Sequence, residues 1–221
     1  MNSINKITLL ITSLDGGGAE GVSITLANKF ADSGWKVDFI VLNLDNALLI
    51  DRLSKNVNLV LLNVKHSRYA SIPLLKYLQK NKTNTVLTFN HELSVILVIL
   101  RIIFRLKLKI ISRNISILSI KIKKLQSESL WTKFIVAPMI KYFYQRIDHV
   151  VNQCNSMHED LISIFPKLTN KSCIIYNPVS THIFDYVNQN DLTKIKKKNY
   201  LLCVGRLEPV KALHYVIESF A

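Results

Sequence analysis

The sequence predicts an α/β fold in which a doubly wound, Rossmann-like parallel sheet is covered by helices. Short runs rich in Val, Ile and Leu alternate with longer amphipathic stretches along the chain. The runs lack polar alternation, which indicates strands buried on both faces, as in a parallel sheet. The 221 residues are 49% hydrophobic and include only six Gly and five Pro, a composition typical of a folded protein. Because such sheets bind ligands beyond the carboxyl ends of their strands, functional residues are expected there.

Eight strands are expected, at 6–12, 36–42, 57–64, 85–89, 108–112, 149–153, 173–176 and 200–204. Helices are expected between them, at 19–33, 47–54, 72–80, 92–105, 123–145 and 156–165. The first apolar run leads into glycines and not into a small-residue cleavage site, so it predicts a strand and not a signal peptide. Four cations interrupt the apolar stretch 93–111, so no transmembrane helix is expected.

A change in composition predicts a domain boundary. After Asn177-Pro178-Val179 comes a polar, lysine-rich run that is typical of a linker. We therefore expect an N-terminal domain at 1–179, a linker at 180–199, and the first strand and helix of a second Rossmann-like domain at 200–221. The linker lysines are interpreted as solvated residues.

The three cysteines indicate a reducing compartment. Cys154, Cys173 and Cys203 have no metal-ligand spacing and lie in apolar surroundings. We expect buried, reduced thiols in a cytoplasmic protein, and neither a disulfide framework nor a zinc site.

The formal net charge of +14 is concentrated in one segment. Residues 101–150 hold eleven of the 29 Lys and Arg but only two acidic residues, interleaved with bulky apolar side chains. This pattern suits a helix at an anionic membrane surface, and equally a core helix with solvated lysines on its outer face. Binding to nucleic-acid phosphates is a third possible explanation of the pattern, but we expect no nucleic-acid partner.

The loop after the first strand contains Gly16, Gly17 and Gly18, followed by a helix. Glycines allow the backbone to approach a ligand closely, and a helix N-terminus offers free N–H groups to an anion. The loop therefore favours a phosphate. With Gly21 it also satisfies the dinucleotide fingerprint, which suggests as an alternative a nicotinamide-dependent oxidoreductase with Asp45 on a ribose.

Polar residues also follow three later strands. His91 can act as an acid or base, or can bond a substrate hydroxyl, and Arg113 can bind phosphate or sugar oxygens. Near the end of the chain, Arg206 and Lys211 can clamp a diphosphate at a strand-to-helix turn. A helix cap beside Glu92 is the alternative for His91, and an exposed loop arginine is the alternative for Arg113.

Three motifs in this order resemble the retaining glycosyltransferase family 4, whose members have the GT-B fold. They are the loop Gly16-Gly17-Gly18-Ala19-Glu20, the hinge Ile175-Tyr176-Asn177-Pro178-Val179, and Val204-Gly205-Arg206-Leu207 with Lys211. Ser112-Arg113-Asn114 further resembles a motif of family members that build surface polysaccharides, although a glutamate of that motif is missing here. The motifs extend over nearly the whole chain.

The resemblance implies transfer of a sugar from a nucleotide-sugar donor to a lipid-linked polysaccharide or glycolipid acceptor, with retention of anomeric configuration. It implies donor or phosphate contacts by Gly16, Gly17, Gly18, Arg206 and Lys211. It implies catalytic roles near sugar hydroxyls for His91 and Arg113, and places Glu20 and Asn114 on the acceptor side. No metal is expected, because two cations would neutralise the leaving diphosphate. Segment 101–150 would contact the inner face of the cytoplasmic membrane.

Two departures from the family pattern affect the expected activity. Ala212 follows Lys211 where the family has glycine, and the chain ends before the two glutamates that hold the donor's sugar and ribose. We therefore expect a truncated protein with little or no transferase activity by itself. The alternative is a non-catalytic protein module that only binds an acceptor or a membrane.

Overall fold

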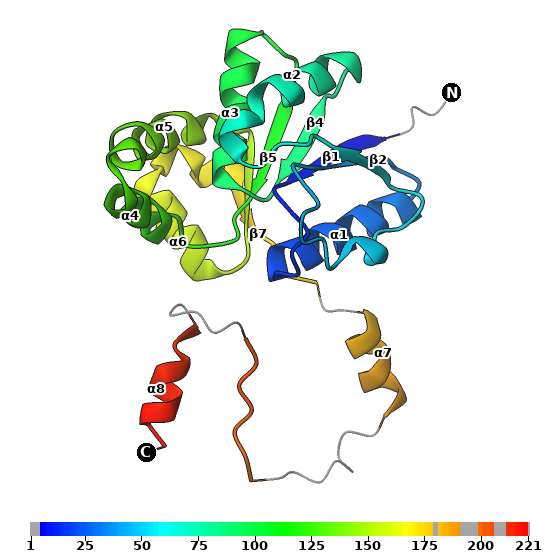
Figure 1. The fold of residues 1–221 in the computed structure, drawn as a ribbon, viewed down its shortest axis with the longest axis vertical. Helices are drawn as coiled ribbons and strands as arrows, with labels where there is room; N and C mark the ends of the chain where they lie inside the picture. The colour runs from blue at the N-terminus through cyan, green and yellow to red at the C-terminus, as the bar shows by residue number, and fades with distance from the viewer. Residues whose placement is uncertain (1–4, 179–180, 191–198, 206–210, 221) are drawn as a thin grey trace. The chain divides into compact units, whose positions relative to one another are not determined.

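The computed structural model describes residues 5–178, 181–190, 199–205 and 211–220. The chain divides into two compact units, Met1–Pro178 and Val179–Ala221. The first unit contains a seven-stranded parallel sheet in the order β3-β2-β1-β4-β5-β6-β7 (Figure 1). The strands are β1 Lys6–Ile11, β2 Lys36–Val41, β3 Asn58–Leu61, β4 Thr85–Thr88, β5 Lys109–Arg113, β6 His149–Asn152 and β7 Ser172–Ile174. The predicted fold class is confirmed.

Six helices of this unit cover the sheet. They are α1 Gly18–Asp32, α2 Ser71–Lys80, α3 His91–Ile103, α4 Leu118–Glu128, α5 Ala137–Phe143 and α6 Asn155–Ile164. Buried side chains of α1 belong to one apolar cluster, and those of α2 to α6 belong to another. The strand order reverses direction between β1 and β4, so right-handed crossovers place α1 on one face and the other helices on the opposite face.

The core explains why the strands are apolar without alternation. On β1, Leu9 and Ile11 pack in the cluster with α1, whereas Leu10 packs in the cluster with the remaining helices. Leu9 and Leu10 are both completely buried. A central parallel strand covered on both faces therefore needs apolar residues at successive positions.

Two predicted helices differ from the structure. Residues 47–54 contain only a 3-10 turn, η1 (Ile50–Arg52). The long helix expected at 123–145 starts earlier, as α4, and is interrupted at Ser129, whose backbone is extended. The hydroxyls of Ser129 and Thr132 bond across the start of the π-helical turn η3 (Thr132–Val136), which leads into α5. Local side-chain bonds to the backbone thus compete with a continuous helix.

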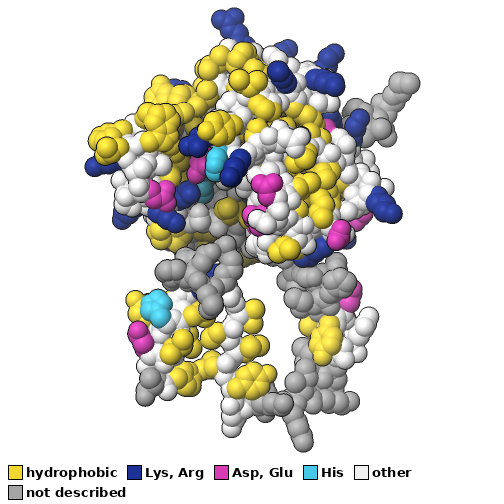
Figure 2. Space-filling view, in the orientation of Figure 1, with side chains coloured by type: hydrophobic (Ala, Val, Ile, Leu, Met, Phe, Trp, Pro, Cys, Tyr) yellow, Lys and Arg dark blue, Asp and Glu magenta, His cyan; other side chains and the backbone are white. Residues whose placement is uncertain are grey.

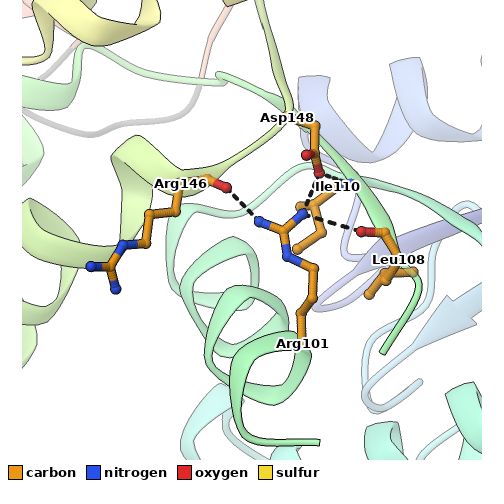
Figure 3. A network of polar contacts seen from close by, with 5 residues as sticks. All are labelled: Arg101, Leu108, Ile110, Arg146 and Asp148. Carbon is orange, nitrogen blue, oxygen red and sulfur yellow. Dashed lines mark hydrogen bonds and ion pairs between the residues drawn. The ribbon is translucent and has the colours of Figure 1, made fainter. Parts of the chain in front are cut away.

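Arg101, near the end of α3, ties that helix to two strands (Figure 3). Its guanidinium donates to a carboxylate oxygen of Asp148 and to the carbonyls of Leu108 and Arg146. Asp148 also accepts from the backbone N–H of Ile110, at 2.7 Å. This cluster joins the residues that precede β6 to β5 and to α3, at the end of the sheet opposite the ligand-binding edge.

In the second unit the described residues form α7 (Thr181–Gln189) and α8 (Leu213–Glu218). Helix α7 lies in the range expected to be a linker. Residues 200–204 have no regular structure, so the strand expected there is absent. A strand needs hydrogen bonds from a neighbouring strand, and the described residues of this unit offer none.

The cysteines differ from the expectation of buried thiols. Cys173 and Cys203 are exposed and Cys154 is half-buried. Cys173 lies on β7, a three-residue strand at the edge of the sheet, and Cys203 lies in the segment that forms no strand. Apolar neighbours in sequence did not bury them, because an edge strand or an unpaired segment is not covered on both faces.

Candidate functional site

A cavity of about 600 Å³ opens at the carboxyl ends of the strands of the first unit. Its lining comes from the loops that follow β1, β2, β3 and β4, together with α4 and the turn η3. These loops supply Thr12, Ser13 and Asp15, then Asn43, then residues 65–68, then Asn90 and Glu92. The volume lies within the range of about 300–1,000 Å³ typical of small-molecule sites, and the position is the ligand edge of doubly wound sheets. We refer to it as the polar cavity.

Charges of both signs line the polar cavity. Lys65, Arg68 and Lys121 contribute cations, and Asp15, Glu92 and Glu128 contribute carboxylates. Figure 2 shows charged side chains and a histidine gathered on this face of the first unit. Lys121 lies 3.5 Å from Glu92, so these two charges are partly neutralised. The cavity therefore offers both donors and acceptors to a ligand with many hydroxyls, and cations to an anionic group.

The glycine-rich loop borders this cavity at Asp15. Gly16 has a φ of +100°, a conformation that side-chain-bearing residues rarely adopt, and Gly17 precedes the first turn of α1. A Cβ placed on Gly17 would meet Glu20, whose carboxylate folds back over the loop, whereas a Cβ on Gly18 would meet nothing within 4 Å. Gly16 thus carries the geometric requirement for glycine, whereas a side chain at Gly17 would require only the flexible Glu20 carboxylate to move, and the N-terminus of α1 lies directly after them.

Asn90, between β4 and α3, is a site residue for which the sequence analysis assigned no role. Its side-chain oxygen accepts from the backbone N–H groups of Glu92 and Leu93, at 2.8 and 3.4 Å, so it caps α3. The cap orients the first turn of α3, in which Glu92 faces the polar cavity and His91 faces the interior. An Asn immediately before a predicted helix is the sequence signal that identifies such a cap.

His91 belongs to a buried polar network beneath the site. It is 5% exposed, and its Nε2 lies 3.1 Å from the side-chain oxygen of Asn114. The hydroxyl of Tyr144 donates to the same oxygen at 2.6 Å, and Asn114 donates to Asn152 at 2.7 Å. Because the Asn114 oxygen only accepts, Nε2 carries the proton. Burial lowers the pKa of His91 to about 4, so the ring is neutral at pH 7.

Tyr144 connects this network to the centre of the sheet. The side chain is fully buried, and its hydroxyl also lies 2.8 Å from the hydroxyl of Ser112 on β5. Ser112 in turn lies 2.9 Å from Ser94 on α3. The network therefore joins β5, α3 and the turn after α5. It holds His91 and Asn114 in place, and neither of them lines the polar cavity.

Arg113 contacts the hinge of the chain. Its guanidinium donates to the carbonyl of Ile175 at 3.0 Å and to the side-chain oxygen of Asn177 at 2.9 Å. The Asn177 amide donates in turn to Gln153, at 3.0 Å. Burial lowers the pKa of Arg113 below its ordinary value. In this structure Arg113 thus orders the residues before Pro178, and its role towards sugar hydroxyls stays a prediction.

The two residues expected to clamp a diphosphate belong to the second unit. Arg206 lies outside the described residues. Lys211 is exposed, and its side-chain carbons lie 3.6 Å from the position of a Cβ on Gly205. Throughout the part of the chain that the structure describes, no group of three or more His, Cys, Asp or Glu could hold a metal ion. No helix within the described ranges has the length and apolar character needed to cross a membrane.

The loop after β3 is a part of the site that sequence reasoning missed. Lys65, His66, Ser67 and Arg68 all line the polar cavity. Sequence reasoning expected a strand through residue 64 and assigned this segment no role. The signal was available, because a cluster of polar residues directly after a predicted strand of a parallel sheet lies at the ligand edge.

Comparison with protein-family models decides between the possible nucleotide-binding families. The model of glycosyltransferase family 4 matches residues 16–183, well over half of the chain. The chain belongs to glycosyltransferase family 4. The match includes the glycine-rich loop, the cavity loops that follow β2, β3 and β4, and the hinge, and it does not favour the oxidoreductase alternative with Asp45. No curated protein sequence matches the chain.

Solved structures show the GT-B fold. The apo form of the lipopolysaccharide outer core galactosyltransferase WaaB is 18% identical, with a TM-score of 0.55, over 79% of this chain and 46% of that one. HepE from Anabaena, in complex with UDP, is 18% identical, with a TM-score of 0.57, over 81% and 46%. A glycosyltransferase from Rickettsia africae is 16% identical, with a TM-score of 0.54, over 98% and 49%. This family 4 chain spans about half the length of these relatives.

Proposed function

We propose that this chain carries the acceptor-binding half of a glycosyltransferase that moves a sugar from a nucleotide-sugar donor to a glycolipid or other lipid-linked acceptor, with retention. The observation that carries the proposal is the polar cavity at the carboxyl ends of the strands of a family 4 fold. Its mixed donors, acceptors and cations suit the hydroxyls and phosphate of such an acceptor.

The names of the solved relatives support both substrates. WaaB is a galactosyltransferase of the lipopolysaccharide outer core, and HepE was solved with UDP, with UDP and glucose, and with UDP-glucose. The proposal assigns the donor phosphates to the glycine-rich loop and to Arg206 and Lys211. The cationic side chains of Arg206 and Lys211 would stabilise the leaving diphosphate without a metal ion.

In this proposal the first unit positions the acceptor for the reaction. Glu92 and Asp15 face the polar cavity, where a carboxylate can accept a hydrogen bond from an acceptor hydroxyl and increase its nucleophilicity. His91, neutral and buried, keeps Asn114 and the first turn of α3 in register behind that surface. Gly16 allows the turn that leads from Asp15 to the N-terminus of α1, whose free N–H groups would face a donor phosphate.

A transfer assay tests the proposal directly. The purified chain is mixed in molar excess with each of a panel of labelled nucleotide sugars and a bacterial lipid extract, so that one slow turnover per molecule is counted. Label is expected to move into the organic phase with one of the donors, and NMR of the product should show the anomeric configuration of that donor. Inversion of that configuration, or rapid multiple turnover by this chain alone, would refute the proposal.

Matched loop variants make the assay specific to the site. Gly17→Val should remove transfer, because its side chain displaces Glu20 from over the loop. Gly18→Ala should leave transfer unchanged, because its Cβ meets nothing within 4 Å. Transfer by Gly17→Val at the wild-type level would separate the glycine-rich loop from the reaction.

The exposed surface around α3 and η3 supports a membrane location on the cytoplasmic face. Ile103, Trp131 and Phe134 are each at least 60% exposed, and Arg105, Lys107 and Lys133 lie near them in the sequence. Apolar side chains interspersed with cations are typical of interfacial binding. In Figure 2 hydrophobic side chains gather over α3 and α5.

Sedimentation with liposomes tests this location. The chain should bind vesicles that contain phosphatidylglycerol and not vesicles of phosphatidylcholine alone, and binding should fall when salt is raised. Neutralising Lys123 and Lys133 should weaken binding. Lys121 and Lys124 are left intact because they pair with Glu92 and Glu128. Equal binding of the wild type and this variant would show that the lysines are only a solvated face.

A further inference from the structure

A second cavity, of about 440 Å³, adjoins the polar cavity in the first unit. Its lining is mostly apolar and comes from α3 and from the stretch η3–α5: Val95, Ile96, Ile99, Met139 and Ile140. Three exposed apolar side chains, Ile103, Trp131 and Ile135, also line it. We call it the apolar groove. An apolar concavity between two helices that remains open at the surface calls for an apolar occupant.

The apolar groove and the polar cavity share part of their lining. Ser67, Arg68, Glu92, Trp131 and Val136 line both of them. At this junction Glu92 pairs with Lys121, whereas Arg68 has no carboxylate of the described residues within 4 Å. The junction thus places an exposed guanidinium, not engaged in an ion pair with the described residues, between an apolar compartment and a polar one. This order of environments matches one kind of molecule, an anionic head joined to a hydrocarbon chain.

We propose that the apolar groove binds the hydrocarbon chain of the acceptor lipid, with Arg68 on the phosphate and the sugar-bearing head in the polar cavity. The inference rests on the proposed function for the identity of the head and goes beyond it by assigning the tail to an internal site of the protein. The lipid then reaches the reaction by inserting its chain between α3 and α5. Contact of the protein surface with the membrane would not by itself bring the lipid chain into the groove.

The surroundings of the groove support this occupant over a protein partner. Two exposed side chains that line the groove, Ile103 and Trp131, also belong to the surface proposed to contact the membrane. A chain leaving the bilayer would therefore pass from hydrocarbon into the groove with little exposure to water. The polar compartment beyond Arg68 would then receive only the head group.

Trp131 supplies a direct optical readout. The chain has two tryptophans, and Trp131 lines both cavities. Trp35 packs against Phe30, at 5.2 Å between ring centroids, in the cluster with α1. In a Trp35→Phe background, the emission of Trp131 therefore reports occupation of the groove. The probes are monomeric hexyl, octyl and decyl phosphate, with the alkyl glucosides of the same lengths for comparison.

The expected result is a saturable blue shift of Trp131 with one phosphate bound per chain. Affinity should rise about fourfold for each added methylene, the factor that corresponds to burying a CH₂ group, and should stop rising once the groove is full. Arg68→Gln should remove the preference for phosphate over glucoside heads and leave the dependence on chain length intact. Absence of saturable binding by every alkyl phosphate would overturn the inference.

Matched variants locate the site. Ile99→Lys places a charge in the groove and should abolish binding. Ile120→Lys makes the same change on α4, at a 60% exposed position outside both cavities, and should have no effect. Ile99→Phe fills part of the groove and should lower the chain length at which affinity stops rising, a result that misfolding cannot produce. Equal binding by the wild type and by Ile99→Lys would also overturn the inference.

The remaining outcomes separate this inference from the proposed function. Saturable binding of alkyl phosphate together with transfer that inverts the anomeric configuration would leave the lipid site standing and refute the proposed function. Binding to anionic vesicles without binding of monomeric alkyl phosphate would leave the membrane surface standing and refute the groove as a lipid site. Sedimentation that shows a dimer lost in Ile99→Lys would assign the groove to a second copy of the chain and overturn the proposed occupant.

Discussion

Acidification is expected to destabilise the first unit through His91. The ring is buried at the start of α3, and its Nε2–H donates to Asn114. Burial is the main cause that lowers its pKa, and the charge of Lys121 adds to it, whereas the bond to Asn114 opposes it. The resulting pKa is about 4, against 6.5 for a histidine in the unfolded chain. The folded protein therefore keeps His91 neutral at a pH where the unfolded chain protonates it.

The sign and size of the effect follow from proton linkage. Between pH 6.5 and about 4 the unfolded state binds the extra proton, so the free energy of unfolding falls as the pH falls. The contribution of His91 is fully present above pH 6.5 and is lost as the pH falls through about 4. The difference between the two pKa values corresponds to about 3 kcal/mol.

Urea unfolding followed by circular dichroism measures this loss. The free energy of unfolding is compared at pH 7, 6, 5 and 4 for the wild type, His91→Gln and His66→Gln. Glutamine at 91 can still donate to Asn114 and does not titrate, so this variant should lose about 3 kcal/mol less than the wild type between pH 7 and 4. His66 is exposed, and its variant should follow the wild type. The same pH dependence in the wild type and His91→Gln would refute the assignment.

Five substitutions at four positions test the local structure by urea unfolding at pH 7. Gly16→Ala should cost about 1–2 kcal/mol because φ is +100° there, whereas Gly18→Ala should be neutral or stabilising; equal effects would contradict the role of φ. Asn90→Ala should cost about 1 kcal/mol through loss of the α3 cap, and Asn90→Asp should restore most of it. Arg101→Met should cost about 2–4 kcal/mol, since it leaves Asp148 and two carbonyls with fewer partners; a change under 0.5 kcal/mol would show that the cluster in Figure 3 is not stabilising.

The strands were predictable because their pattern has one physical cause. Burial on both faces requires apolar residues at successive positions, as at Leu9 and Leu10, and this requirement is visible in the sequence. The helices were less predictable where polar side chains compete with the backbone. Ser129 and Thr132 interrupt the helix expected at 123–145 through bonds that composition does not reveal.

The candidate site was predictable in part. The glycine-rich loop and the polar residues after β4 were identified because strand ends define the ligand edge. The side of the helix that each residue faces was not predictable, since His91 and Glu92 are neighbours in the sequence and face opposite directions. The strand expected at 200–204 did not form, because a strand is stabilised by a neighbour and not by its own apolar residues.

The sequence by itself determined the fold class, the family and the location of the ligand edge, since all three depend on local patterns of apolar residues, glycines and short motifs. Only the tertiary structure decided which polar residues are buried and which line a cavity. His91, Asn114 and Arg113 became interior or hinge residues, while Arg68 and Trp131, which lie far apart in the chain, came together where the polar cavity meets the apolar groove. That juxtaposition depends on the packing of α3 against α5 and on the turn after β3, which no single segment encodes.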